Sequence, residues 1–220
     1  MVLYNSAVSG NCYKVRLLFA QLGIEYETVE MSVVDRTNRS EVLGELNPGL
    51  RVPTLVLDDG RPLGESNAIL WYFGDGTQYV PEDGYERAQV LQWQFFEQYS
   101  HEPNIAVARF WLACSGRPRE EFADRLPGWL KGGYAALDAM EAHLRDRAFL
   151  CRHVFGICAP ARQSEHALSR TPLPHARTNG FHFPGELHAR DVLRESWRRR
   201  IFAFALQQVS AIECGGAHAD

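Results

Sequence analysis

The segments Arg51-Val52-Pro53-Thr54-Leu55 and Gly64-Glu65-Ser66-Asn67-Ala68-Ile69 decide how this chain is expected to fold. Pro53 stands between a β-branched residue and an apolar, strand-like run, and it has no backbone donor of its own. A cis bond before Pro53 would turn the N–H and C=O of Val52 outward, where they could pair with the backbone of a bound peptide. We therefore expect a cis bond here and a ligand-binding edge beside it.

The second segment joins a charge and a hydroxyl to the start of an apolar helix. Glu65 and Ser66 directly precede a helical pattern that runs to Phe73. Unpaired N–H groups at a helix start, together with the Ser66 hydroxyl, suit a carboxylate, whereas the Glu65 charge suits an ammonium group. The two segments together predict a pocket for a peptide-like anion.

Hydrophobic periodicity around these segments predicts an α/β unit followed by an all-α unit. The expected elements of the first unit are strand 2–4, helix 12–22, strand 24–29, helix 40–46, a hairpin over 54–63 and helix 66–73. This βαβαββα order is that of a thioredoxin-like domain, expected over residues 1–76. After a Gly- and Pro-containing linker, a helical domain is expected over 85–220, with one helix broken at Pro103 and another over 130–149.

Composition excludes several classes of function. The chain has 220 residues, a formal net charge of −4 and 45% apolar residues, and its basic residues do not cluster before the C-terminal part. These features predict no nucleic-acid partner, and the absence of a long apolar run predicts no membrane span. Five irregularly spaced Cys indicate neither a disulfide framework nor a metal site, so a cytoplasmic location is expected.

The order Ser9-Gly10-Asn11-Cys12, Asn47-Pro48, Val52-Pro53 and Glu65-Ser66 resembles the N-terminal domain of the cytosolic glutathione transferases. The resemblance covers residues 1 to about 150 and is strongest to bacterial, theta- or zeta-like members that use a Ser. It implies a homodimeric detoxification enzyme that joins the thiolate of its co-substrate glutathione to a small hydrophobic electrophile. It further implies that Arg51, Val52, Pro53, Glu65 and Ser66 bind glutathione.

A free thiol with a pKa of about 8.5 must be activated to react at neutral pH. The resemblance places Ser9 at the catalytic position, where its hydroxyl would donate a hydrogen bond to the sulfur. Asn11 is a second candidate donor, and Cys12, near a helix start, is a third candidate that could form a mixed disulfide. Three residues of the first long helix, Tyr99, Asn104 and Phe110, are expected to border the pocket for the second substrate.

Two other functions fit the same residues. A glutathione-dependent disulfide reductase or peroxidase would use Asn11 or Cys12 in place of Ser9. An inactive glutathione-binding module would keep the first pocket and lack the second.

Residues 151–220 have a different composition from the rest of the chain. Six of the eight His lie there, with nine Arg and no Lys, and Pro160 stands where the resembling proteins have a helix. We hypothesise that this part is read partly out of frame; a diverged or loop-rich tail is the alternative. Resequencing the gene decides between them, since an unbroken frame rules out the first.

Overall fold

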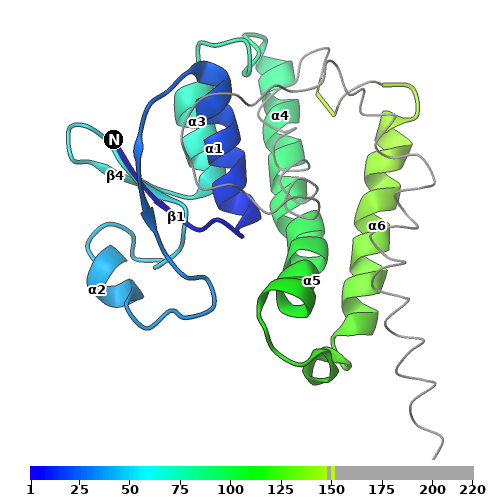
Figure 1. Ribbon diagram of the computed structural model, residues 1–220. Coiled ribbons are helices and arrows are strands. Elements are labelled where there is room, and N and C mark those ends of the chain that lie inside the picture. The colour runs from blue at the N-terminus through cyan, green and yellow to red at the C-terminus, as the bar shows by residue number, and fades with distance from the viewer. Residues whose placement is uncertain (148–149, 152–220) are drawn as a thin grey trace, which may run out of the picture.

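The N-terminal half contains a mixed four-stranded sheet (Figure 1). The computed structural model describes residues 1–147 and 150–151. The strands are β1 (Val2–Asn5), β2 (Glu27–Glu30), β3 (Thr54–Val56) and β4 (Pro62–Gly64), in the order β2-β1-β3-β4. β1 and β2 are parallel because a helix crosses between them, and β3 runs antiparallel to both β1 and β4.

Helices α1 (Gly10–Leu22) and α3 (Ser66–Gly74) cover one face of this sheet, and the short α2 (Arg39–Leu43) lies beyond the other (Figure 1). The core between sheet and helices consists of fully buried apolar side chains: Leu3, Val15, Phe19, Leu55 and Ile69. Burial of such side chains stabilises the fold by roughly 1.5–3 kcal/mol each. The predicted thioredoxin-like fold is thereby confirmed.

The helical half begins with one long run. It comprises α4 (Gly84–Phe96), the π-helix η1 (Glu97–Ala106), α5 (Val107–Arg109) and the π-helix η2 (Phe110–Cys114). The 3₁₀ turn η3 (Arg119–Phe122) then leads to α6 (Leu126–Leu144). The predicted break at Pro103 is wrong, because Pro103 lies inside η1, where the hydrogen bonds span one residue more than in an α-helix.

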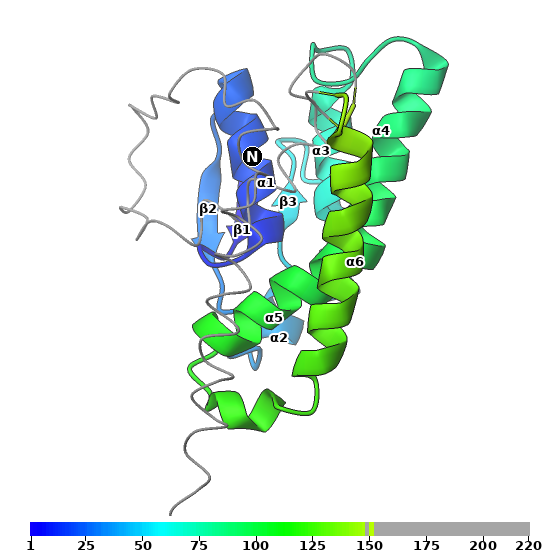
Figure 2. The same ribbon diagram turned by 90° about the vertical axis from the view of Figure 1, so that its right-hand side faces the viewer.

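The two halves share an apolar core. Leu18 of α1 and Leu70 of α3 pack in one cluster with Val90 and Trp93 of α4 and Met140 of α6. Figure 2 shows α6 beside α4, with α1 and α3 behind them. Trp71 of α3 also donates its indole N–H to Gln94 of α4. The site described below is therefore held between two firmly packed halves.

Two smaller expectations differ from the structure, and a third falls outside the described residues. β2 begins at Glu27 and not at 24, because Ile24 and Tyr26 pack into the sheet core while the strand itself is an exposed edge. α6 begins at Leu126, four positions before the expected start at 130, with a Pro in its first turn. Residues 148–149 and 152–220, including the segment of the frame hypothesis, lie outside the described residues.

Within the described ranges, no helix combines the length and apolar character that crossing a bilayer requires. The same residues contain no group of three His, Cys, Asp or Glu side chains that could bind a metal ion.

Candidate active site

The start of α1 carries Ser9. This residue has extended backbone angles and caps the helix, since its Oγ accepts a hydrogen bond from the backbone N–H of Cys12 at 3.3 Å. A hydroxyl that accepts in this way keeps its own proton. Ser9 can therefore cap α1 and still donate to a ligand, so the capping role and the predicted catalytic role are compatible.

The loop that leads from β1 to Ser9 is fixed by charged groups. Asn5 donates to the Glu30 carboxylate at 2.6 Å, and Glu30 also accepts from the backbone N–H of Ala7. Arg16 of α1 donates to the Asn5 side chain and to the carbonyl of Ser6. Because the loop is tied to both β2 and α1, the position of Ser9 is set by the domain core.

Cys12 faces the interior. Its side chain is fully buried, and its Sγ accepts a hydrogen bond from the Ser6 N–H at 3.3 Å. Burial raises the pKa of this thiol, an effect that hydrogen bonds from Ser9 and Ser6 only partly offset. A buried, protonated thiol is a poor nucleophile, so the structure disfavours Cys12 as the reactive group.

The Val52–Pro53 peptide bond is cis, as expected. Among the described residues, no hydrogen-bond partner is found for the N–H or C=O of Val52. Asn47 supports this loop, because its Nδ2 donates to the Thr54 hydroxyl at 2.9 Å and to the Arg51 carbonyl at 3.2 Å. The main chain of Val52 is thus held in place and remains available to a ligand.

The start of α3 is built differently from that of α1. Glu65 is exposed and lies in the positive-φ region (φ 61°), and it makes no side-chain cap. Ser66 is buried, and its Oγ donates to the Oδ1 of Asn11 at 3.3 Å. This contact joins two residues 55 positions apart and brings together the starts of α1 and α3.

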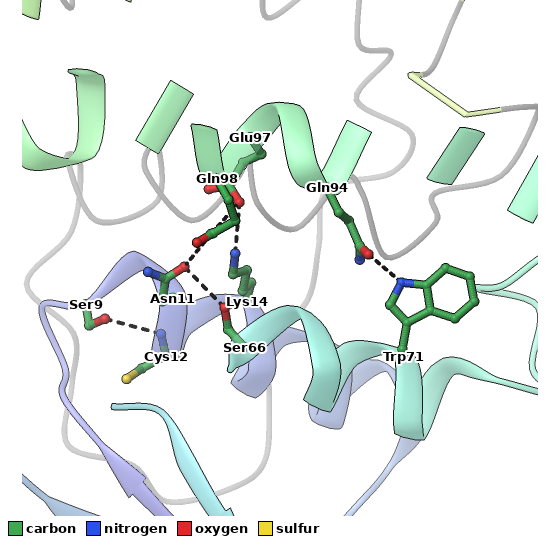
Figure 3. Close-up of polar contacts among 9 residues, drawn as sticks. All are labelled: Ser9, Asn11, Cys12, Lys14, Ser66, Trp71, Gln94, Glu97 and Gln98. Carbon is green, nitrogen blue, oxygen red and sulfur yellow. Dashed lines mark hydrogen bonds and ion pairs between the residues drawn. The ribbon is translucent and has the colours of Figure 1, made fainter. Parts of the chain in front are cut away.

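The helical half reaches the same place through η1 (Figure 3). Gln98 donates from Nε2 to Asn11 Oδ1 at 3.3 Å and to Glu97 Oε2 at 2.8 Å. Glu97 also accepts from the Nζ of Lys14 at 3.0 Å, and the two side chains are only 12% and 1% exposed. A buried ion pair therefore lies directly behind the candidate site.

Glu102 adds another carboxyl at this boundary. Burial raises the pKa of Glu102, and the nearby Glu97 charge raises it further, whereas Lys14 and Arg51 act in the opposite direction. The positive charge of the exposed Arg51 side chain therefore acts on Glu102, a residue of the helical half.

The three residues expected around the second pocket lie in η1 and η2 of the helical half. Tyr99 is 82% exposed. Asn104 donates to the Ser100 carbonyl at 2.7 Å and lies so close to Gly132 of α6 that a Cβ added there would meet it at 2.2 Å. Phe110 packs edge-to-face on Trp111. Asn104 thus serves helix packing in this structure.

The protein has a thioredoxin-like domain followed by a helical domain, and polar groups from both meet at the starts of α1 and α3. Residues 8–75 match the family model described as glutathione S-transferase, N-terminal domain. A crystal structure of a glutathione S-transferase from Pseudomonas fluorescens is 41% identical with a TM-score of 0.72, covering 76% of this chain and 84% of that one. The chain belongs to the glutathione S-transferase family.

Two further comparisons set the range of the similarity. The curated glutathione S-transferase U10 of Arabidopsis thaliana is 34% identical over 97 residues, which cover 42% of this chain and 40% of that protein. The chain spans about half the length of the curated relatives that it matches. Ure2p5 of Phanerochaete chrysosporium, cocrystallised with 1-(S-glutathionyl)-2,4-dinitrobenzene, shares the fold at 24% identity and a TM-score of 0.66, covering 76% of this chain and 75% of that one.

Sequence reasoning missed three supporting residues. Asn47 was part of the quoted pattern and received no role. Lys14 carried a usable signal, because it is a charged residue on the apolar face of a predicted helix, between Cys12 and Val15. Gln98 carried none, since polar residues are ordinary on a surface helix.

Proposed function

We propose that this protein is a glutathione transferase that joins the glutathione thiolate to a small electrophile. The observation that carries the proposal is the Ser66–Asn11 hydrogen bond, which unites the starts of α1 and α3 beside the Val52–Pro53 bond. In this arrangement Val52 pairs with the cysteinyl backbone of glutathione. The start of α3 receives the γ-glutamyl carboxylate, Glu65 its ammonium group, and Arg51 the glycyl carboxylate.

The reaction requires stabilisation of the sulfur anion. Lowering a thiol pKa by two units corresponds to about 2.7 kcal/mol in favour of the anion. The Ser9 hydroxyl or the Asn11 amide supplies this by donating a hydrogen bond, and the thiol proton leaves to solvent. The sulfur then forms a bond to the electrophilic carbon as the leaving group, such as halide, departs with its electron pair.

The helical half supplies the remaining features of the proposal. In this proposal Tyr99 and Phe110 neighbour the electrophile, and the protein is a cytoplasmic homodimer. Leu91, Phe95 and Tyr99 form an exposed apolar row on α4 and η1 at helical spacing, which suits contact with a second copy. Light scattering of the purified protein tests this, because a monomer mass at micromolar concentration contradicts it.

Thermal unfolding with and without glutathione, combined with conjugation of an aryl halide, tests the main proposal. We expect a higher midpoint with glutathione and a conjugation rate that Ser9→Ala or Asn11→Ala reduces. An unchanged midpoint at millimolar glutathione contradicts binding. A raised midpoint without conjugation of any aryl halide tested contradicts transferase activity and supports an inactive binding module.

A glutathione-dependent disulfide reductase or peroxidase is the second candidate. Asn11 is compatible with it, because an amide donor can stabilise a glutathione thiolate that attacks a disulfide as well as one that attacks carbon. Burial of Cys12 argues against the version that needs a protein thiol. Ser9→Ala separates the candidates, since the transferase loses aryl halide conjugation and the reductase keeps disulfide reduction.

A further inference from the structure

We propose that Gln98 of the helical half is a positioning residue that fixes the orientation of the Asn11 amide, so that the Asn11 Nδ2 faces the glutathione sulfur. This inference rests on the proposed function and identifies how its thiol site is oriented. The two ends of an Asn side chain are nearly equal in shape, so only hydrogen-bond partners decide which end faces the ligand.

The orientation begins at a charge. Lys14 is 1% exposed and can only donate, so it holds the Glu97 carboxylate at 3.0 Å. Glu97 can only accept, so Gln98 must present its nitrogen to Glu97, at 2.8 Å. The Lys14–Glu97 ion pair therefore decides that the nitrogen of the Gln98 amide, and not its oxygen, faces Glu97.

The second step passes this orientation to Asn11. An amide nitrogen has two protons, and the second proton of Gln98 Nε2 is directed at Asn11 Oδ1 at 3.3 Å. The same Oδ1 accepts from Ser66 Oγ at 3.3 Å. With both contacts on the oxygen, the two protons of Asn11 Nδ2 are left for the opposite side.

The placement of these groups agrees with a role toward the ligand. Figure 3 shows the Asn11 nitrogen pointing away from both Gln98 and Ser66, while its oxygen faces them. Asn11 stands one residue inside α1 and Ser9 caps this helix, so both candidate donors lie in its first turn. Within the described residues, Nδ2 makes no hydrogen bond.

Two variants of Gln98 test the proposal. Gln98→Met keeps the length and removes both donors, and Gln98→Glu keeps the shape but can only accept, which turns the Asn11 nitrogen toward the helical half. We expect Gln98→Met to raise the pKa of the bound glutathione thiol by about one pH unit and Gln98→Glu to raise it further. The thiolate absorbance of bound glutathione is titrated against pH.

Binding of S-methylglutathione, which has no thiol proton, serves as the second readout. A positioning role leaves its Kd within about twofold, whereas structural damage weakens it. Gln89→Met is the matched control, because Gln89 also lies on the first long helix and donates to the Tyr85 hydroxyl at 3.3 Å, away from the site. This control leaves both the thiol pKa and the Kd unchanged.

The double variant Asn11→Ala/Gln98→Met isolates the pathway. If Gln98 acts through Asn11, the thiol pKa of the double variant equals that of Asn11→Ala alone. Additive shifts, or an unchanged thiol pKa in both Gln98 variants, overturn the proposal. A pKa that responds to Ser9→Ala and not to Asn11→Ala also overturns it but leaves the transferase function standing. Failure of the unmodified protein to bind S-methylglutathione contradicts the proposed function itself.

Discussion

The starts of α1 and α3 lie next to each other, but only α1 has a side-chain cap. α1 is capped by Ser9 and connected to the helical half through Lys14 and Asn11. α3 has no side-chain cap, and the residue before it, Glu65, holds a positive φ. A helix start that its own chain satisfies can act as a scaffold, whereas one left open can bind an anion. In the proposed function, the capped start of α1 therefore supports the fold and faces the thiol, whereas the open start of α3 binds the carboxylate of the ligand.

The largest effect is expected where α1 is connected to the helical half. Lys14→Met leaves the Glu97 carboxylate buried without its cation, so we expect the free energy of unfolding to fall by about 3 kcal/mol. Denaturant unfolding measures this change. Lys131→Met, at an exposed position of α6, is the control and should alter stability little.

A second variant makes this prediction sharper. Adding Glu97→Gln to Lys14→Met removes the orphaned charge and should recover much of the loss, because the cost lies in the unpaired charge. A loss below about 1 kcal/mol in Lys14→Met alone would show that Glu97 turns to water, and the division between scaffold and ligand site would weaken.

The next effect concerns ligand binding at α3. Ser66→Ala removes a hydroxyl next to the uncapped N–H groups, and we expect glutathione binding to weaken about tenfold, or about 1.4 kcal/mol. Its unfolding free energy should fall by only about 0.5 kcal/mol, since the Ser66–Asn11 bond is long. Titration calorimetry and denaturant unfolding measure the two quantities.

Ser9→Ala is the matched comparison at the other helix start. It removes the cap of α1 and should cost about 1 kcal/mol of stability, while the affinity for S-methylglutathione changes little. If both Ser variants lost affinity and stability in equal measure, the two helix starts would have no separate roles.

Part of the fold and of the candidate site could be predicted from the sequence. Pro53, Glu65 and Ser66 were readable because each has a local signature, a missing donor or a helix start, and their strands and helices formed where periodicity predicted. The link from Lys14 through Glu97 and Gln98 to Asn11 joins residues up to 87 positions apart, and no local pattern specifies such contacts. Pro103 was misread because a π-helix has no signature that hydrophobic spacing can detect.

A smaller effect is expected at Glu65. A non-Gly residue at φ 61° and ψ 114° is strained by on the order of 1 kcal/mol. Glu65→Gly should therefore raise the thermal midpoint slightly, while loss of the carboxylate weakens glutathione binding. Glu25→Gly, at an exposed position where φ is not positive, is the control and should not stabilise. Stabilisation of both variants alike would contradict the strain at Glu65.

The smallest effect is a change in pH dependence at the boundary between the two halves. Burial raises the pKa of Glu102 above its ordinary value of about 4.3, so the folded state binds this proton more tightly than the unfolded state. The resulting contribution to stability is full below the ordinary pKa and is lost as the pH rises through the raised value. Glu102→Gln removes this dependence, so we expect the free energy of unfolding of the variant to rise relative to that of the unmodified protein as the pH rises from 4 toward neutral.

Denaturant unfolding across that pH range measures the difference at Glu102, with Glu141→Gln on α6 as the comparison. A Glu102→Gln variant that lost stability at neutral pH would show that the charges of Lys14 and Arg51 outweigh burial, and Glu102 would then belong to the scaffold around α1.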